Sequence, residues 1–142
     1  MVTHSQGRAA VAGLIVVAGT LAMTWAQGQT PADDPRFTGI STAIESKDLS
    51  VARRRFEPGA RSAWHTHDNG QLLYVEDGRM RTQKRGQTMK ELGPGESDYT
   101  GPRVEHWHGA VPFTHLVQVN VGFGGETRWL QKTTDDEYAG RK

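Results

Sequence analysis

Two pairs of histidines stand out in this sequence of 142 residues, because a single residue separates the members of each pair. His65 and His67 form the first pair, and His106 and His108 form the second. Side chains alternate between the faces of a β-strand, so on strands both members of a pair would point to the same side. Neutral imidazoles held on rigid strands are suitable ligands for a divalent metal. The chain has no cysteine, so nitrogen and oxygen atoms would have to hold any such ion.

A fifth histidine, His115, opens a segment in which it alternates with Val117, Val119 and Val121. We expect these four side chains to face the interior of a barrel, where His115 would join the two pairs. A single inward histidine is as often a hydrogen-bonded core residue as a functional group, and both interpretations stay open for His115. The histidines beyond the three that a metal would use favour an enzyme.

The elements that must position these histidines are short β-strands. Glycine recurs between residues 59 and 125, often beside Pro or Asn, and the segments between the glycines are short and alternating. The sequence predicts strands at 49–56, 61–67, 71–76, 79–84, 88–92, 97–100, 104–108, 115–121 and 126–132. Such spacing is typical of an all-β sandwich or closed barrel. Thr134 and Glu137 fit a capping box, which predicts a short C-terminal helical turn.

Residues 1–26 differ in composition from the rest of the chain. Arg8 precedes an uncharged, apolar run that ends before the small residue Ala26 and a polar stretch, an order typical of a secretory signal peptide. A retained N-terminal membrane anchor is the alternative. We therefore expect an exported bacterial protein, periplasmic or secreted, with no stable membrane association after signal cleavage.

The rest of the chain divides into an extended arm at 27–48, a barrel at 49–133 and a tail at 134–142. Removing Arg8 with the signal peptide would reduce the 17 Lys and Arg residues to 16, equal to the 16 Asp and Glu residues. A neutral chain is not expected to bind nucleic acid. The basic run Arg53-Arg54-Arg55 splits between two faces of a strand, and we expect solvated or ion-paired surface there.

The first histidine pair lies within a regular spacing of glycines and polar residues. Gly59 is followed after five residues by His65 and His67, then after three residues by Gln71 and after six by Gly78. This spacing resembles the first motif of the cupin family. Glutamate is usual at the position of Gln71. The resemblance implies a single cupin barrel, which is a double-stranded β-helix or jelly roll.

The second histidine pair lies in a looser match to the second cupin motif. Gly95 is followed after five residues by Gly101 and then by His106, but Gly101 stands where proline is usual and Arg103 where glycine is usual. The resemblance implies that one metal ion is bound by His65, His67, Gln71 and His106. Manganese or iron is favoured, and zinc, nickel and copper are the alternatives. An exported chain folds outside the cytosol, where the higher affinity of copper and zinc favours them over manganese and iron.

The segment His106-Trp107-His108-Gly109-Ala110, a later Thr114-His115 and Gln71 resemble a narrower cupin subgroup. Its members are small bacterial cupins that act as manganese-dependent hydroxynitrile lyases. This resemblance implies a carbon–carbon lyase acting on cyanohydrins or related small hydroxy or carbonyl compounds, with His108 and His115 as acid/base residues. A metal-dependent oxygenase and a non-catalytic metal-binding or ligand-binding cupin are the alternatives.

A glutamine among the ligands has an electrostatic consequence. Three imidazoles and an amide oxygen are all neutral, so a divalent ion would keep its full charge, whereas a glutamate at position 71 would neutralise half of it. The ion would then be a stronger Lewis acid. The alternative interpretation of Gln71 is a polar strand residue outside the metal's coordination shell.

Trp64 and Trp107 alternate with the histidines, so they should lie on the outer side of their strands. Large aromatic side chains there are expected to be covered by an opposing sheet, by the N-terminal arm or by a partner subunit. We therefore expect a homodimer that takes a small-molecule substrate.

Overall fold

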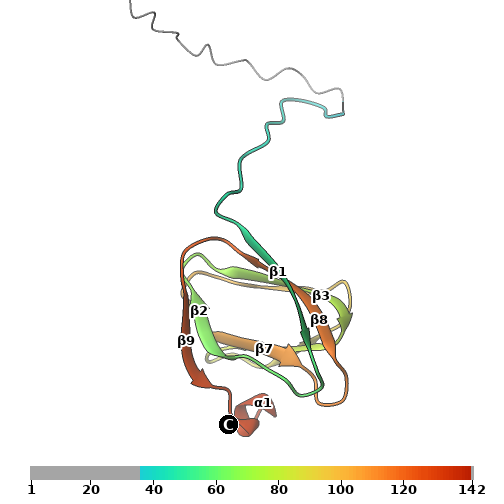
Figure 1. Ribbon diagram of the computed structural model, residues 1–142, viewed down its shortest axis with the longest axis vertical. Helices are drawn as coiled ribbons and strands as arrows, with labels where there is room; N and C mark the ends of the chain where they lie inside the picture. Colours follow the sequence, from blue (N-terminus) through green and yellow to red (C-terminus); the bar gives the residue numbers. More distant parts are fainter. Residues whose placement is uncertain (1–35, 142) are drawn as a thin grey trace, which may run out of the picture. The chain divides into compact units, whose positions relative to one another are not determined.

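The computed structural model in Figure 1 describes residues 36–141, so the predicted signal peptide and the first part of the predicted arm lie outside the described residues. Contacts divide the chain into two units, Met1–Ala43 and Ile44–Lys142. Residues 36–43 of the first unit form no helix or strand. Within residues 36–141, no helix is both long enough and apolar enough to cross a bilayer.

The second unit is built from short antiparallel strands, and the nine predicted strands and the C-terminal turn are confirmed. The elements are β1 (Ser50–Phe56), β2 (Ala63–His67), β3 (Gln71–Gly78), β4 (Met80–Lys84), β5 (Lys90–Leu92), β6 (Ser97–Thr100), β7 (His106–Ala110), β8 (Leu116–Gly122), β9 (Thr127–Lys132) and α1 (Asp135–Tyr138).

These strands form two sheets that face each other as a jelly roll (Figure 1). One sheet has four strands in the order β1-β8-β3-β6, and the other has five in the order β5-β4-β7-β2-β9. β2 and β7, which carry the histidine pairs, are adjacent strands inside the five-stranded sheet. The all-β jelly roll expected from the sequence is therefore correct.

The space between the sheets is partly apolar and partly polar. The apolar part is filled by fully buried side chains, namely Leu73, Val75, Met80, Ala110 and Leu116, with Phe56 and Leu92 packed against them. The polar part contains buried His65, Gln71, His106, His108 and Gln118. Burial of polar groups at this density is costly unless partners satisfy them, so the polar part is where a functional site is expected.

The two tryptophans are covered, but not by the elements that the sequence suggested. Trp64 is 2% exposed and Trp107 is fully buried, and both pack against Tyr138 of α1. The Tyr138 hydroxyl donates a hydrogen bond of 2.7 Å to the Ala110 carbonyl, and the capping box at Thr134 begins this helical turn. The C-terminal turn of the same chain therefore covers these side chains, and they no longer support a subunit interface.

The face of β8 that points inward differs from the prediction. Leu116 and Gln118 are buried, whereas Val117 and Val119 are only half-buried. The inward face therefore holds the even-numbered residues, and the expectation that His115 and three alternating valines face the interior is wrong. The physical reason is that this part of the interior is polar, so glutamine rather than valine occupies it.

The β3–β4 turn depends on a glycine, which gives a test of the fold. Gly78 has a φ of 78°, and a Cβ atom there would collide with the carbonyl group of His115. We expect Gly78→Ala to reduce the free energy of unfolding by about 3 kcal/mol, from the left-handed backbone and the clash together. Denaturant unfolding measures the loss.

Gly86 is the matched control, because it has the same φ of 78° but open space around the site of a Cβ atom. Gly86→Ala should cost only the backbone strain, about 1–2 kcal/mol. If both variants lost the same free energy of unfolding, the close approach of His115 to Gly78 would not constrain the turn.

Candidate metal centre

The pairing of β2 with β7 brings the two histidine pairs together. His65 lies directly opposite His106 in the register, and their ring centroids are 4.2 Å apart. Alternation places His67 and His108 on the same face, with ring centroids 5.1 Å from His65 and 5.9 Å from His106, respectively. We call these four residues the histidine cluster.

The histidine cluster is neutral and removed from water. His65, His106 and His108 are at most 4% exposed, and one ring nitrogen from each lies within 4.8 Å of the others, so these side chains could bind a metal ion. Burial is the main reason that the pKa of His65 is lowered to about 4 and that of His106 to about 3. Neighbouring imidazoles contribute to both shifts, because a second positive charge would be repelled. At neutral pH the rings therefore have lone pairs available for a metal.

Backbone carbonyls fix which nitrogen of two rings carries the proton. His65 donates from Nδ1 to the Ala63 carbonyl at 2.9 Å, and His106 donates from Nδ1 to the Val104 carbonyl at 3.2 Å. In each neutral ring the Nε2 atom is then left with a free lone pair. Hydrogen bonds of this kind orient metal-binding histidines in proteins.

Gln71 reaches the histidine cluster from β3, in the opposite sheet. Its Oε1 atom lies 3.1 Å from Nε2 of His106, so two acceptors face each other. The Nε2 atom of His67 is buried and has no hydrogen-bond partner. A cation between these atoms would satisfy all three, and the residues present therefore fit a metal ion.

His108 is held in the opposite tautomer. The side-chain amide of Gln118 donates to Nδ1 of His108 at 3.0 Å, so the proton of the neutral His108 ring lies on Nε2. The same amide group also donates to Oδ1 of Asn120, which fixes its orientation. Burial holds the pKa of His108 well below its usual value. His108 is thus a neutral donor beside rings that present lone pairs.

Gln118 and Asn120 were missed by sequence reasoning. Their signal is present in the sequence as two polar residues at alternate positions of a valine-rich strand. Polar residues at alternate positions can lie on either face of a sheet, so only the folded structure shows that Gln118 faces His108.

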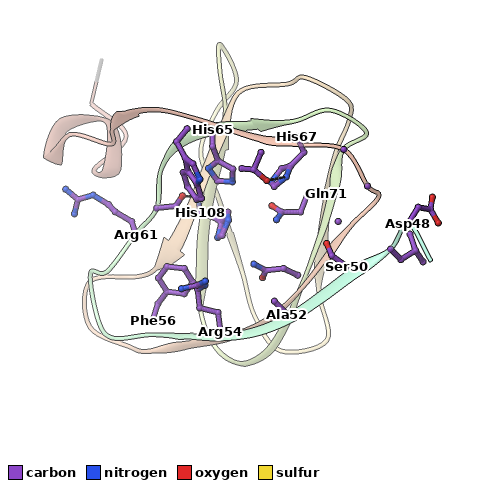
Figure 2. Close-up of a pocket in the computed structure, with 18 of the residues that line it drawn as sticks. Asp48, Ser50, Ala52, Arg54, Phe56, Arg61, His65, His67, Gln71 and His108 are labelled. Carbon is purple, nitrogen blue, oxygen red and sulfur yellow. Dashed lines mark hydrogen bonds between the residues drawn. The ribbon is translucent and has the colours of Figure 1, made fainter. Parts of the chain in front are cut away.

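A cavity of about 640 Å³ opens between the two sheets next to the histidine cluster (Figure 2). Its volume is in the range of small-molecule sites in proteins. His65, His67, His108 and Gln71 line one side, and the inward residues of β1 line the other. On β9, the Thr127 hydroxyl lies 2.9 Å from Nδ1 of His67, and the ring of Trp129 is centred 4.7 Å from that of His65.

The structure brings five of the six predicted site residues together, and it does not bring His115 to them. Nε2 of His115 lies 2.8 Å from a carboxylate oxygen of Asp77, and the His115 side chain is 30% exposed. His115 is not among the residues that line the cavity. The cause is the start of β8 at Leu116, which turns the preceding side chain away from the interior.

Comparison with known proteins agrees with this architecture. The Cupin domain family matches residues 52–114. The chain is 37% identical over 124 residues to (R)-mandelonitrile lyase of Granulicella tundricola, and the match covers 80% of this chain and 92% of that relative.

Solved structures give the same family. A cupin-like protein from Thermotoga maritima has a TM-score of 0.64 and 36% identity, and the match covers 67% of this chain and 74% of that protein. A DMSP lyase from Ruegeria pomeroyi has a TM-score of 0.56 over 63% of this chain and 47% of its own, but at 14% identity it shares the fold alone. The extent of the sequence match to a relative of similar length means that the chain belongs to the cupin family, as a small cupin close to the hydroxynitrile lyase-like subgroup.

Proposed function

We propose that this cupin is a metal-dependent lyase that cleaves the carbon–carbon bond of cyanohydrins or related small hydroxy compounds. The observation that carries the proposal is the difference in tautomer within the histidine cluster. His65 and His106 present lone pairs, whereas His108 presents a proton next to the same cavity. The similarity to a mandelonitrile lyase over most of both chains supports the same reaction class.

The metal ligands in this proposal are His65, His67, Gln71 and His106. The unpartnered Nε2 of His67 and the two facing acceptors of Gln71 and His106 support this set. His108 forms a buried group with His65 and His106 that could also hold an ion, but it is left out because its Nδ1 accepts a hydrogen bond from Gln118 and its Nε2 carries the proton. Manganese or iron is the preferred ion, because an amide oxygen among the donors suits a harder cation than copper. When bound, such an ion would lower the pKa of a substrate hydroxyl group and stabilise the alkoxide.

The reaction needs groups that stabilise negative charge and move one proton. Cleavage breaks the bond between the hydroxyl-bearing carbon and the nitrile carbon, and both electrons leave with the nitrile carbon. The hydroxyl proton is transferred overall to cyanide, which gives a carbonyl compound and hydrogen cyanide. His108 can donate a hydrogen bond from Nε2 to the developing anion, and Gln118 keeps that proton on Nε2 by its hydrogen bond to Nδ1.

Export and a homodimer also remain proposals. The outer face of the four-stranded sheet exposes Val51, Tyr74 and Tyr99, which are 70%, 42% and 51% exposed. A second copy of the chain would cover these apolar side chains, which supports a dimer through this sheet.

The proposed reaction requires no oxidant, which separates it from an oxygenase. We expect the metal-loaded protein to release benzaldehyde and cyanide from mandelonitrile at the same rate with and without oxygen, because cleavage changes no oxidation state. Absorbance of benzaldehyde under anaerobic conditions measures the rate, with chelator-treated protein as the control. A requirement for oxygen, or an equal rate after metal removal, would contradict the proposal.

We expect the His108 side chain to be needed for turnover and not for metal binding. We expect His108→Ala to retain the metal by elemental analysis but to lower kcat/KM for mandelonitrile by roughly 10²–10³-fold, the usual effect of removing a hydrogen-bond donor to a developing anion. His115→Ala is the matched control, since His115 pairs with Asp77 outside the cavity, and its kcat/KM should change little. Loss of metal from His108→Ala would make His108 a ligand instead.

Gln71→Glu tests the charge of the site. The carboxylate should bind the metal more tightly and lower kcat by about tenfold, because a less positive centre stabilises an alkoxide less well. Gln87→Glu introduces the same charge at an exposed position and should change neither quantity. Metal retention during dialysis against a chelator and steady-state kinetics give the two measurements. Equal behaviour of both variants would mean that Gln71 does not contact the metal.

A further inference from the structure

Strand β1 forms one side of the cavity, and it carries three consecutive arginines that the proposed reaction does not use. Successive side chains of a strand point to opposite faces, so the three arginines do not all lie on one face of β1. Arg53 pairs with Glu76, and Arg55 pairs with Glu57 at 2.8 Å, as expected of ion-paired surface. Arg54 points to the other face and lines the cavity. Arg53 and Arg55 are therefore ion-paired surface, as expected, and Arg54 is also exposed to solvent but lies on the face that lines the cavity.

Arg54 differs from Arg61 and Lys47, which also line the cavity, because its side chain has no ion pair or hydrogen bond among residues 36–141. Arg61 is paired with Asp135 and also donates to the Thr133 carbonyl. Lys47 is paired with Glu45 at 2.7 Å. A guanidinium group that lacks a protein partner has all of its donors available to a ligand.

Arg54 lines the same cavity as three members of the histidine cluster, His65, His67 and His108. Ala52, Arg54 and Phe56 share the inward face of β1, where neighbouring side chains are about 7 Å apart. The ring of Phe56 is centred 5.8 Å from that of His108. Figure 2 shows Arg54 beside Phe56, across the cavity from His65 and His67. A small molecule between the two sheets could thus touch Arg54 and the histidine cluster at once.

One carboxylate also lines the cavity, but it is remote from Arg54. Asp48 precedes β1, and Figure 2 places it at the opposite end of the cavity. Asp48 lies in the turn before β1, and the strand from Ser50 to Arg54 alone corresponds to roughly 13 Å. That distance exceeds the Debye length of about 8 Å at physiological ionic strength, so Asp48 does not neutralise Arg54.

We propose that Arg54 anchors the substrate, and that the substrate carries a carboxylate at the end remote from its reacting hydroxyl group. The planar guanidinium group can form two parallel hydrogen bonds with a carboxylate. The proposal rests on the proposed function, because that function is what places the substrate hydroxyl group at the histidine cluster. It specifies that cyanohydrins or related hydroxy compounds with a carboxylate are preferred to neutral compounds of the same shape, such as mandelonitrile.

Binding of two unreactive alcohols tests the proposal without any turnover. 4-(Hydroxymethyl)benzoate and 4-(hydroxymethyl)benzamide have nearly the same shape, but only the benzoate is charged. We expect the metal-loaded protein to bind the benzoate about tenfold more tightly in calorimetry, as expected for one charge-assisted bidentate contact. Because neither compound has a nitrile to lose, a failure of the lyase reaction would leave this comparison intact.

Arg54→Gln should abolish the preference for the benzoate. Arg53→Gln is the matched control, since it removes the same charge from the same strand but from the outer face. Arg54→Lys keeps the charge and loses the planar fork, so it should keep part of the preference. Melting temperature and metal content verify that each variant is folded. A preference that survives in Arg54→Gln, falls equally in Arg53→Gln, or is absent from the unaltered protein would overturn the proposal.

Discussion

The site depends on one pairing, that of β2 with β7, which sets His65 directly opposite His106. Because alternation then fixes His67 and His108, a single register determines the position of four imidazoles. A shift of one residue in either strand would turn the two imidazoles of that strand toward the face that the tryptophans and α1 now occupy. That opposite face is itself well packed, with Trp64 and Trp107 buried against Tyr138. Apolar packing on one side of the sheet therefore stabilises the register that the polar side requires.

The neutral state of the histidine cluster follows from the same pairing. Buried imidazole rings this close together cannot all be positively charged, so burial and mutual repulsion lower the pKa values of His65, His106 and His108. Contacts with Ala63, Val104 and Gln118 then decide which nitrogen keeps the single proton. Hydrogen bonds at the far side of each ring, and not residue type, thus decide whether that ring presents a lone pair or a proton.

Much of this arrangement could be predicted from the sequence, because strand alternation and motif spacing are local properties. They correctly gave the strands and the convergence of His65, His67, Gln71, His106 and His108. They failed for His115, because alternating valines indicate an apolar interior and this interior is polar. They also could not identify Arg54, because the sequence does not show which arginines of β1 meet an acidic residue from another strand, as Arg53 meets Glu76. Such long-range pairings are not encoded in the spacing of any one segment.

The location of Arg54 and Phe56 on β1 has an evolutionary consequence. β1 is an edge strand that pairs only with β8, whereas the histidine cluster lies on two inner strands of the other sheet. Substitutions along the inward face of β1 can therefore alter which molecules the cavity accepts while the imidazoles keep their register and tautomers. A lineage with this architecture can change the molecules that fit its cavity by drift on one edge strand, with the histidine cluster inherited unchanged.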